Sequence, residues 1–142
     1  MGITYLFECS RCGYRAWVSG RPDEGFTFSV KTISCRDCNA LYDAVQRVKI
    51  PELTESELRQ MGMGMRGFGW PYWQRRPDAP PTFNAALNRL NFNGARRFKW
   101  VTYNLRCPVS PSHRVEEWTE PNKCPRCKSF MEKHPLPYRI WD

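Results

Sequence analysis

Three Cys-x-x-Cys pairs constrain this chain more than any other feature of its sequence. They are Cys9–Cys12, Cys35–Cys38 and Cys124–Cys127, and Cys107 is the seventh cysteine. An odd number of cysteines does not close a disulfide framework, whereas seven thiolates and one imidazole complete two tetrahedral metal sites. A bound ion ties two such turns together and replaces part of the apolar core that a short segment lacks. The sequence therefore predicts two bound metal ions, which we interpret as two Zn²⁺.

Nearness along the chain predicts how the eight ligands divide between the two ions. The first site takes the two N-terminal pairs: Cys9, Cys12, Cys35 and Cys38. The second site takes the remaining cysteines and one histidine: Cys107, His113, Cys124 and Cys127. His134 competes with His113 for the fourth position, and the neighbouring prolines, Pro111 and Pro135, do not choose between them.

Residues rich in β-branched and aromatic side chains flank the cysteine pairs and predict strands. The predicted strands cover residues 4–8, 15–19, 26–33, 41–50, 98–106, 114–119 and 129–133, with a turn at 20–25 and an extended tail at 135–142. Two short helices are expected between them, at 55–61 and 83–92. The second has Thr82 as its cap and an apolar face of Phe83, Ala86, Leu87 and Leu90.

The order of strands and Cys-x-x-Cys turns in residues 1–50 resembles the zinc-ribbon and rubredoxin-like superfamily, and residues 95–142 resemble it more loosely. This resemblance implies a small, metal-bound, mainly β fold with two zinc ribbons. One or two short helices would lie between the ribbons. The expected domains are an N-terminal ribbon at 1–50, a central segment rich in aromatic residues, Gly and Pro at 51–94, and a basic C-terminal ribbon at 95–142.

The charge of the chain points to an anionic partner. The sequence carries 22 Lys and Arg against 14 Asp and Glu, a formal net charge of +8, which two thiolate-bound Zn²⁺ would lower to about +5. Residues 95–142 hold 10 of the basic and 5 of the acidic groups. Such a cationic surface can bind phosphates, and exposed aromatic rings can stack on unpaired bases. The nucleic-acid contacts expected from this pattern are Arg66, Trp70, Trp73, Arg75, Arg76, Arg96, Arg97, Lys99, Lys123, Arg126 and Lys128. In the alternative interpretation, these rings pack over the small ribbons and the arginines are solvated.

These observations together predict a non-catalytic, cytoplasmic protein that binds nucleic acid, alone or within a larger complex. The alternative is an adaptor that binds a protein partner, with the ribbons as rigid platforms. A redox protein is a more remote alternative. It is suggested by Cys9-Ser10-Arg11-Cys12-Gly13-Tyr14, which resembles a rubredoxin knuckle, but rubredoxins are typically acidic and this chain is basic. A zinc enzyme is equally remote, because no Glu or His has the spacing of a deaminase general base. No apolar run is long enough to span a membrane, and the absence of a Gly-rich phosphate loop disfavours a nucleotide-binding α/β domain. The sequence implies no small-molecule substrate.

Overall fold

The structure is a computed structural model that describes residues 1–51, 80–89 and 97–142. Within these ranges the chain is mainly β, with nine elements that include a single short helix. The helix predicted at 55–61 and most of the central segment lie outside the described residues. No helix in the described part of the chain is long and apolar enough to cross a membrane.

The first sheet joins the two ends of the chain. Its order is β2-β1-β8, with β1 at Gly2–Glu8, β2 at Arg15–Val18 and β8 at Glu132–Trp141, all antiparallel. The extended tail expected at 135–142 is thus part of a strand, in spite of its two prolines. Prolines are tolerated in β8 because it is an edge strand, where a missing N–H costs no ladder bond on the open side.

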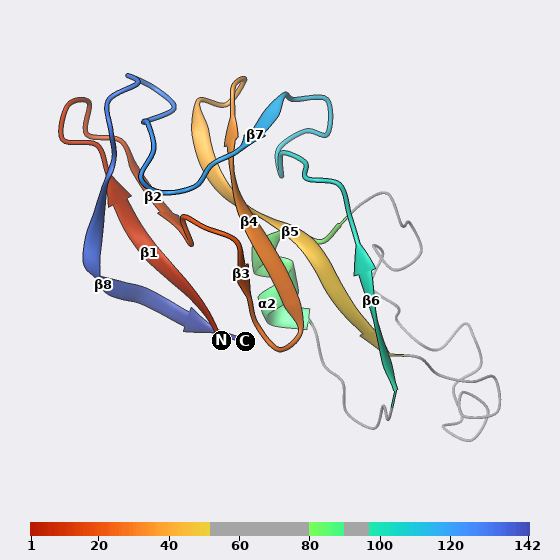
Figure 1. Ribbon diagram of the computed structural model, residues 1–142. Helices are drawn as coiled ribbons and strands as arrows, with labels where there is room; N and C mark the ends of the chain where they lie inside the picture. The colour runs from red at the N-terminus through yellow and green to blue at the C-terminus, as the bar shows by residue number, and fades with distance from the viewer. Residues whose placement is uncertain (52–79, 90–96) are drawn as a thin grey trace.

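The second sheet has the order β3-β4-β5-β6. Its strands are β3 at Asp23–Glu24, β4 at Phe28–Cys35, β5 at Ala40–Pro51 and β6 at Phe98–Thr102. The short β7, Val115–Glu117, pairs with the far end of β4. Both sheets therefore combine strands from residues 1–51 with strands from residues 97–142. In Figure 1 the sheets lie side by side, with the four cysteine-bearing loops at one end and both termini at the other.

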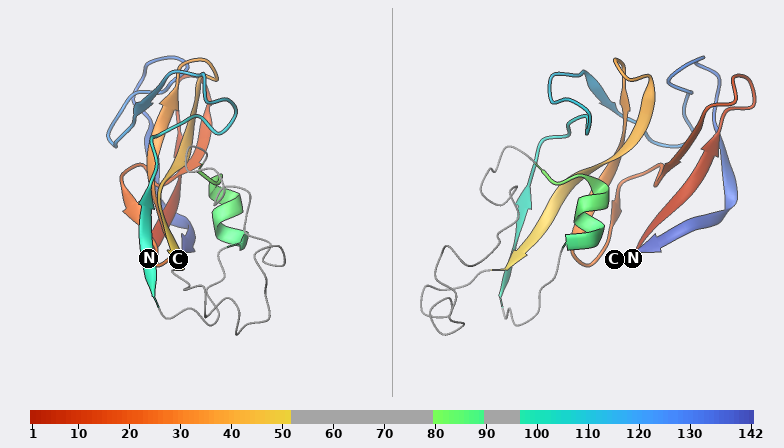
Figure 2. Two further views of the ribbon diagram at one scale, coloured as in Figure 1. Left: turned by 90° about the vertical axis from the view of Figure 1, so that its right-hand side faces the viewer. Right: turned by 180° about the vertical axis from the view of Figure 1, so that it is seen from behind.

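Helix α2, Phe83–Arg89, covers one face of the second sheet, as the edge-on and rear views in Figure 2 show. The helix lies within the predicted range, and Thr82 caps it as predicted, because its Oγ1 accepts a hydrogen bond from the Ala85 N–H at 3.3 Å. Ala86 is buried, and Phe83 and Leu87 pack beside it against the second core cluster. Leu90 lies outside the described residues.

Two apolar clusters form the core. The second cluster lies between α2 and the second sheet and includes Trp141 from β8, which stacks on Phe28 with ring centroids 4.6 Å apart. The first cluster lies under the cysteine loops and contains Phe7, Tyr14, Trp118 and two of the cysteines. These two cysteines, Cys9 and Cys124, are thus part of the core, whereas Cys12 is exposed.

Candidate metal centres

The eight predicted ligands gather into two groups of four. Cluster 1 consists of Cys9, Cys12, Cys124 and Cys127, and cluster 2 consists of Cys35, Cys38, Cys107 and His113. In each cluster the four ligand atoms all lie within 4.8 Å of one another. Each cluster can therefore hold a metal ion with four protein ligands.

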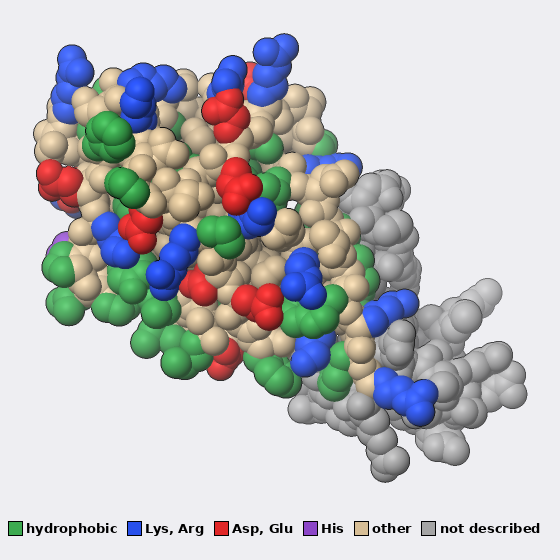
Figure 3. Space-filling view, viewed as in Figure 1, with side chains coloured by type: hydrophobic (Ala, Val, Ile, Leu, Met, Phe, Trp, Pro, Cys, Tyr) green, Lys and Arg blue, Asp and Glu red, His purple; other side chains and the backbone are tan. Residues whose placement is uncertain are grey.

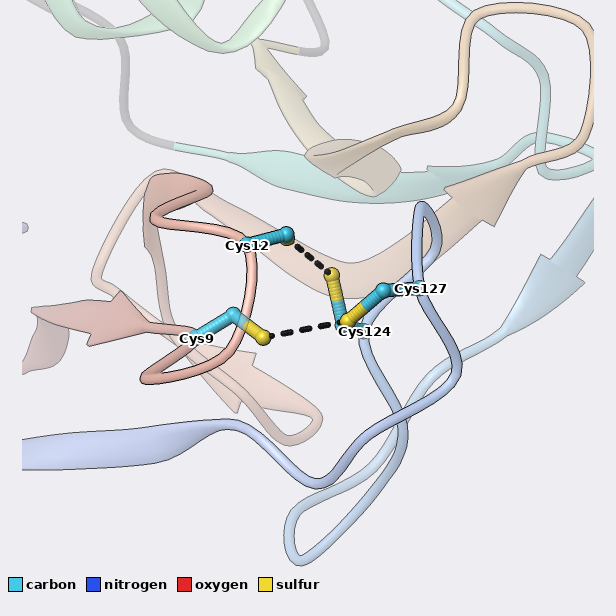
Figure 4. A group of neighbouring side chains, drawn as sticks. All are labelled: Cys9, Cys12, Cys124 and Cys127. Atoms are coloured by element: carbon cyan, nitrogen blue, oxygen red, sulfur yellow. Dashed lines mark hydrogen bonds between the residues drawn. The ribbon is translucent and has the colours of Figure 1, made fainter.

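The sulfur atoms of cluster 1 have the spacing of a tetrahedral thiolate site (Figure 4). The Sγ atoms of Cys9 and Cys127 are 3.3 Å apart, and those of Cys12 and Cys124 are 3.6 Å apart. Metal–sulfur bonds of about 2.3 Å in tetrahedral geometry place neighbouring sulfurs about 3.8 Å apart. A disulfide requires about 2.05 Å, and all seven cysteines are free. The cluster therefore fits a metal and not a disulfide bridge.

Cluster 2 adds an imidazole nitrogen to three thiols. The Nδ1 atom of His113 lies 3.4 Å from the Sγ of Cys38 and 3.6 Å from the Sγ of Cys35. The Sγ atoms of Cys38 and Cys107 are 3.7 Å apart. Bonds of about 2.3 Å to sulfur and about 2.05 Å to nitrogen give sulfur–nitrogen separations of about 3.6 Å in a tetrahedron. The donor set thus fits one tetrahedral ion, with Nδ1 as the coordinating atom.

The three Cys-x-x-Cys turns are here called knuckles. The backbone builds the first and the third of them in the same way. The N–H of Gly13 donates to the Cys9 carbonyl, and the N–H of Cys9 donates to the Tyr14 carbonyl, both at 2.9 Å. Lys128 and Ser129 make the equivalent bonds with Cys124, at 3.0 and 2.6 Å. This loop turns the two sulfurs of a pair toward one point.

A left-handed residue closes each of the three knuckles, four positions after the first cysteine. These residues are Gly13 with φ 77°, Asn39 with φ 50° and Lys128 with φ 65°. Backbone N–H groups also point at the sulfurs: Cys38 N lies 3.3 Å from the Cys35 Sγ, and Arg126 N lies 3.4 Å from the Cys124 Sγ. Donors of this kind stabilise a thiolate, which is the form that binds a metal.

The thiols of cluster 1 differ strongly in acidity. The backbone N–H of Ser129, followed by the Cys9 thiol, lowers the pKa of Cys127 to about 6. The backbone of Tyr14 favours the Cys12 thiolate, but desolvation and the other three cysteines outweigh it and raise the pKa of Cys12 to about 12. Four sulfurs this close cannot all ionise without a compensating cation, so a divalent ion would bind with release of protons.

The thiols of cluster 2 also differ in acidity. Burial alone would raise the pKa of Cys107. The backbone N–H groups of Ser110 and Val109, together with His113, outweigh burial and lower this pKa to about 7. Burial and the neighbouring cysteines raise the pKa of Cys38 to about 11, against a favourable hydrogen bond from Tyr42. The chemistry of both donor sets therefore fits a cation at their centre.

The predicted pairing of the ligands is wrong, although the eight ligand residues gather as two sets of four. Cys9 and Cys12 meet the third knuckle instead of Cys35 and Cys38, which meet Cys107 and His113. The reason lies in the sheets: β8 pairs with β1 and brings the third knuckle to the first, while β7 pairs with β4 beside the second knuckle. His134 lies on the exposed strand β8, away from both clusters, so His113 is the histidine of the candidate site.

An arginine stands between the two cysteines of every knuckle, and sequence reasoning included only one of the three. Arg126 lies over the Tyr14 ring, with its Cζ 4.5 Å from the ring centroid, and its Nε donates to the Asn39 carbonyl at 3.4 Å. Arg36 pairs with Glu116, and Arg11 donates to Ser129 Oγ at 3.4 Å. The sequence contained this signal, since one of the two residues between the cysteines of each pair is an arginine. A cation beside thiolate ligands offsets part of their negative charge.

The other residues predicted to contact nucleic acid fall into separate places. Arg97 immediately precedes β6 and Lys99 lies within it, and both are exposed, whereas Lys123 and Lys128 lie at the third knuckle. The structure does not bring these two groups together. The remaining predicted contacts lie outside the described residues: Arg66, Trp70, Trp73, Arg75, Arg76 and Arg96.

Comparisons of the chain with protein-family models, with curated proteins and with solved structures gave no significant match. The assignment of a function therefore depends on the chemistry of the residues. That chemistry describes a mainly β chain with two candidate metal centres, each built from two distant parts of the sequence.

Proposed function

We propose that this chain is a two-zinc protein in which the metal ions are structural and a cationic surface binds nucleic acid. The observation that carries the first part is the presence of four convergent protein ligands in each cluster. Four protein ligands complete the tetrahedral shell of Zn²⁺ and leave no position for a reactive water, which distinguishes structural from catalytic zinc. Sites with four Cys, or with three Cys and one His, are typical structural zinc sites.

The position of the clusters supports a structural role. Cluster 1 connects the turn between β1 and β2 to the loop between β7 and β8. Cluster 2 connects the turn between β4 and β5 to the loop between β6 and β7. Each ion would thus join two parts of the chain that are distant in sequence, and zinc affinity would become part of the folding free energy.

Counting bound zinc in double variants tests both the metal and the pairing. In native mass spectrometry we expect two zinc ions in the wild type, one in Cys9→Ser/Cys124→Ser, and none in Cys9→Ser/Cys35→Ser. The first double variant damages one cluster twice, whereas the second damages both clusters. The pairing by nearness along the chain reverses these two results. Absence of zinc from the wild-type protein, or iron in its place, would reject the zinc assignment.

The proposal of nucleic-acid binding is supported by charge. The formal net charge of +8 falls only to about +5 when two zinc sites are counted, and cations are exposed on β6 and around the knuckles. Exposed cations bind phosphates with the release of counterions, so the affinity falls steeply as salt is added.

Fluorescence anisotropy with labelled oligonucleotides at low and moderate salt tests this proposal. We expect the logarithm of the binding constant to fall by about 0.7 per contacted phosphate for each tenfold rise in salt, for single strands. Charge reversal at Arg97, Lys99, Lys123 and Lys128 should weaken binding strongly, while the zinc content stays at the wild-type value. No measurable binding at about 50 mM salt would reject the proposal.

One observation favours the second candidate, a protein adaptor. Leu136, Tyr138 and Ile140 on the edge strand β8 are exposed, and Tyr138 with Trp17 borders a groove of about 560 Å³. Large exposed apolar side chains on one strand are typical of protein-binding surfaces. Capture of one protein in high salt, without oligonucleotide binding in low salt, would favour this candidate.

A further inference from the structure

The solvent face of β5 and β6 carries alternating cations and aromatic rings. The strand register places Lys49 opposite Trp100 and Arg47 opposite Thr102. Their neighbours Val48 and Val101 point to the other face of the sheet, into the core beneath α2. Figure 3, which views the molecule from the side opposite α2, shows Lys and Arg side chains interleaved with hydrophobic ones over these strands.

Direct contacts organise this face. The Nζ of Lys49 lies 4.1 Å from the ring centroid of Phe26, 5.0 Å from that of Phe98 and 6.0 Å from that of Trp100. The guanidinium carbon of Arg47 lies 4.6 Å from the Trp100 ring centroid. These cation–π contacts favour positions of the two cations beside the faces of the rings. Phe26 is 60% exposed, and Trp100 is half-buried.

The charge on this face is incompletely neutralised. In the described part of the chain, no carboxylate lies within ion-pair distance of Lys49. Arg47 has one partner, Glu24, at 3.5 Å, and both side chains are substantially exposed. An exposed ion pair of this kind contributes little to stability, so a phosphate can replace Glu24 beside Arg47 at little cost. Both cations are therefore available to a polyanion.

We propose that this face, formed by Phe26, Arg47, Lys49 and Trp100, is a stacking platform for unpaired bases of single-stranded nucleic acid. The inference depends on the proposed nucleic-acid function and adds its site and its substrate class. Bases inside a duplex already stack on each other, so aromatic rings on a protein surface favour strands whose bases are free. Arg47 and Lys49 contact the phosphates, while the rings of Phe26 and Trp100 contact the bases.

Binding of a short labelled oligothymidylate and of a duplex of equal length, each to the zinc-loaded protein, tests this inference. Phe26→Ala should weaken single-strand binding roughly 5- to 150-fold, because base–aromatic stacking has that magnitude. Phe26→Tyr keeps the ring and should bind like the wild type. Tyr138→Ala is the matched control, since it removes an exposed aromatic ring from β8 in the other sheet. Lys49→Gln should weaken binding and lower the salt dependence, and Lys133→Gln on β8 controls for the lost charge.

A photocrosslinking measurement on the unmutated protein gives a second readout. An oligonucleotide that carries bromouracil should crosslink to peptides containing Phe26 or Trp100, as identified by mass spectrometry. Wild-type affinity of Phe26→Ala and Lys49→Gln, with crosslinks elsewhere, would overturn the platform and leave the nucleic-acid function intact. Equal affinity for single strand and duplex would also overturn it. Absence of all oligonucleotide binding would reject the proposed function and this inference with it.

Discussion

At the scale of single residues, backbone conformation explains why two glycines of similar φ differ in their tolerance of substitution. Gly13 and Gly20 have φ of 77° and 76°, in the left-handed region that side chains disfavour. A Cβ at Gly13 would meet no heavy atom within 4 Å, whereas a Cβ at Gly20 would collide with the ring of Phe7. Phe7 is buried in the first core cluster and cannot move aside cheaply.

We therefore expect Gly13→Ala to lower the free energy of unfolding by about 1 kcal/mol, which is the backbone cost alone. Gly20→Ala should cost about 1–3 kcal/mol more, because overpacking is added. Urea denaturation of the zinc-loaded variants measures both values. Equal costs would show that the Phe7 ring relaxes freely around the added methyl group.

Asp43 on β5 is a buried carboxylate that accepts hydrogen bonds from Ser19 and Thr32. Ser19 donates its N–H to both oxygens, at 2.9 and 3.0 Å, and its hydroxyl to Oδ2 at 3.0 Å. The Thr32 hydroxyl donates to Oδ1 at 2.7 Å. Burial nevertheless outweighs these bonds and raises the pKa of Asp43 from 3.8 to about 6.

A raised pKa means that the folded chain holds the Asp43 proton more tightly than the unfolded chain does. The contribution of this carboxyl to stability is therefore full below about pH 4 and is lost as the pH rises toward 6, by at most about 1.4 kcal/mol per pH unit. Between pH 5 and 7 we expect the free energy of unfolding of the wild type to fall relative to Asp43→Asn, in paired urea titrations with excess zinc. The exposed Glu132→Gln serves as the control variant. A difference between wild type and Asp43→Asn that stays constant with pH would contradict this assignment.

At the scale of elements, α2 is a short helix that depends on its cap. The Thr82 carbonyl accepts from the Ala86 N–H at 2.9 Å, and its hydroxyl satisfies the N–H of Ala85. We expect Thr82→Ala to lower the free energy of unfolding by about 1 kcal/mol, and Thr82→Ser to restore most of that loss. Thermal unfolding followed by circular dichroism measures the effect. A neutral Thr82→Ala would mean that packing on the sheet alone holds the helix.

Local sequence patterns predicted most of the described elements, because strands and the helix cap depend on neighbouring residues. The run 26–33 is rich in β-branched and aromatic side chains and forms β4 at Phe28–Cys35. The two-residue strand β3 falls where a turn was expected, since Asp23 and Glu24 have low strand propensity and are held by pairing with β4. The platform on β5 and β6 was missed, because alternation places Arg47 and Lys49 on one face but does not reveal which strand lies beside them.

At the scale of the whole molecule, each of the two ligand clusters combines two residues from the N-terminal part of the chain with two from the C-terminal part. The ligand types followed from the sequence, but the pairing did not. A Cys-x-x-Cys turn specifies that its own two sulfurs converge, and it says nothing about which second pair completes the site. The entropic cost of closing a loop grows only slowly with its length, so nearness in sequence is a weak guide to the partner.

This arrangement predicts the behaviour of a cut chain. If a protease site is inserted between residues 52 and 79 and cleaved, the two fragments should stay together through both clusters and both sheets. Adding a strong chelator should release zinc and separate them, because each ion takes half of its ligands from each fragment. Size-exclusion chromatography with and without chelator measures this. Fragments that separate while each retains one zinc ion would instead support two self-contained ribbons.

Because each cluster takes ligands from both the early and the late part of the chain, the order of synthesis matters for metal binding. Cys9, Cys12, Cys35 and Cys38 emerge long before Cys107, His113 and the third knuckle are translated. Between the synthesis of Cys38 and that of Cys107, a metal ion that reaches the nascent chain would encounter four thiols that the finished fold assigns to different clusters. If both clusters hold zinc as proposed, correct maturation would require either late loading or exchange of ligands after release, and the speed of metal delivery would affect the folding yield.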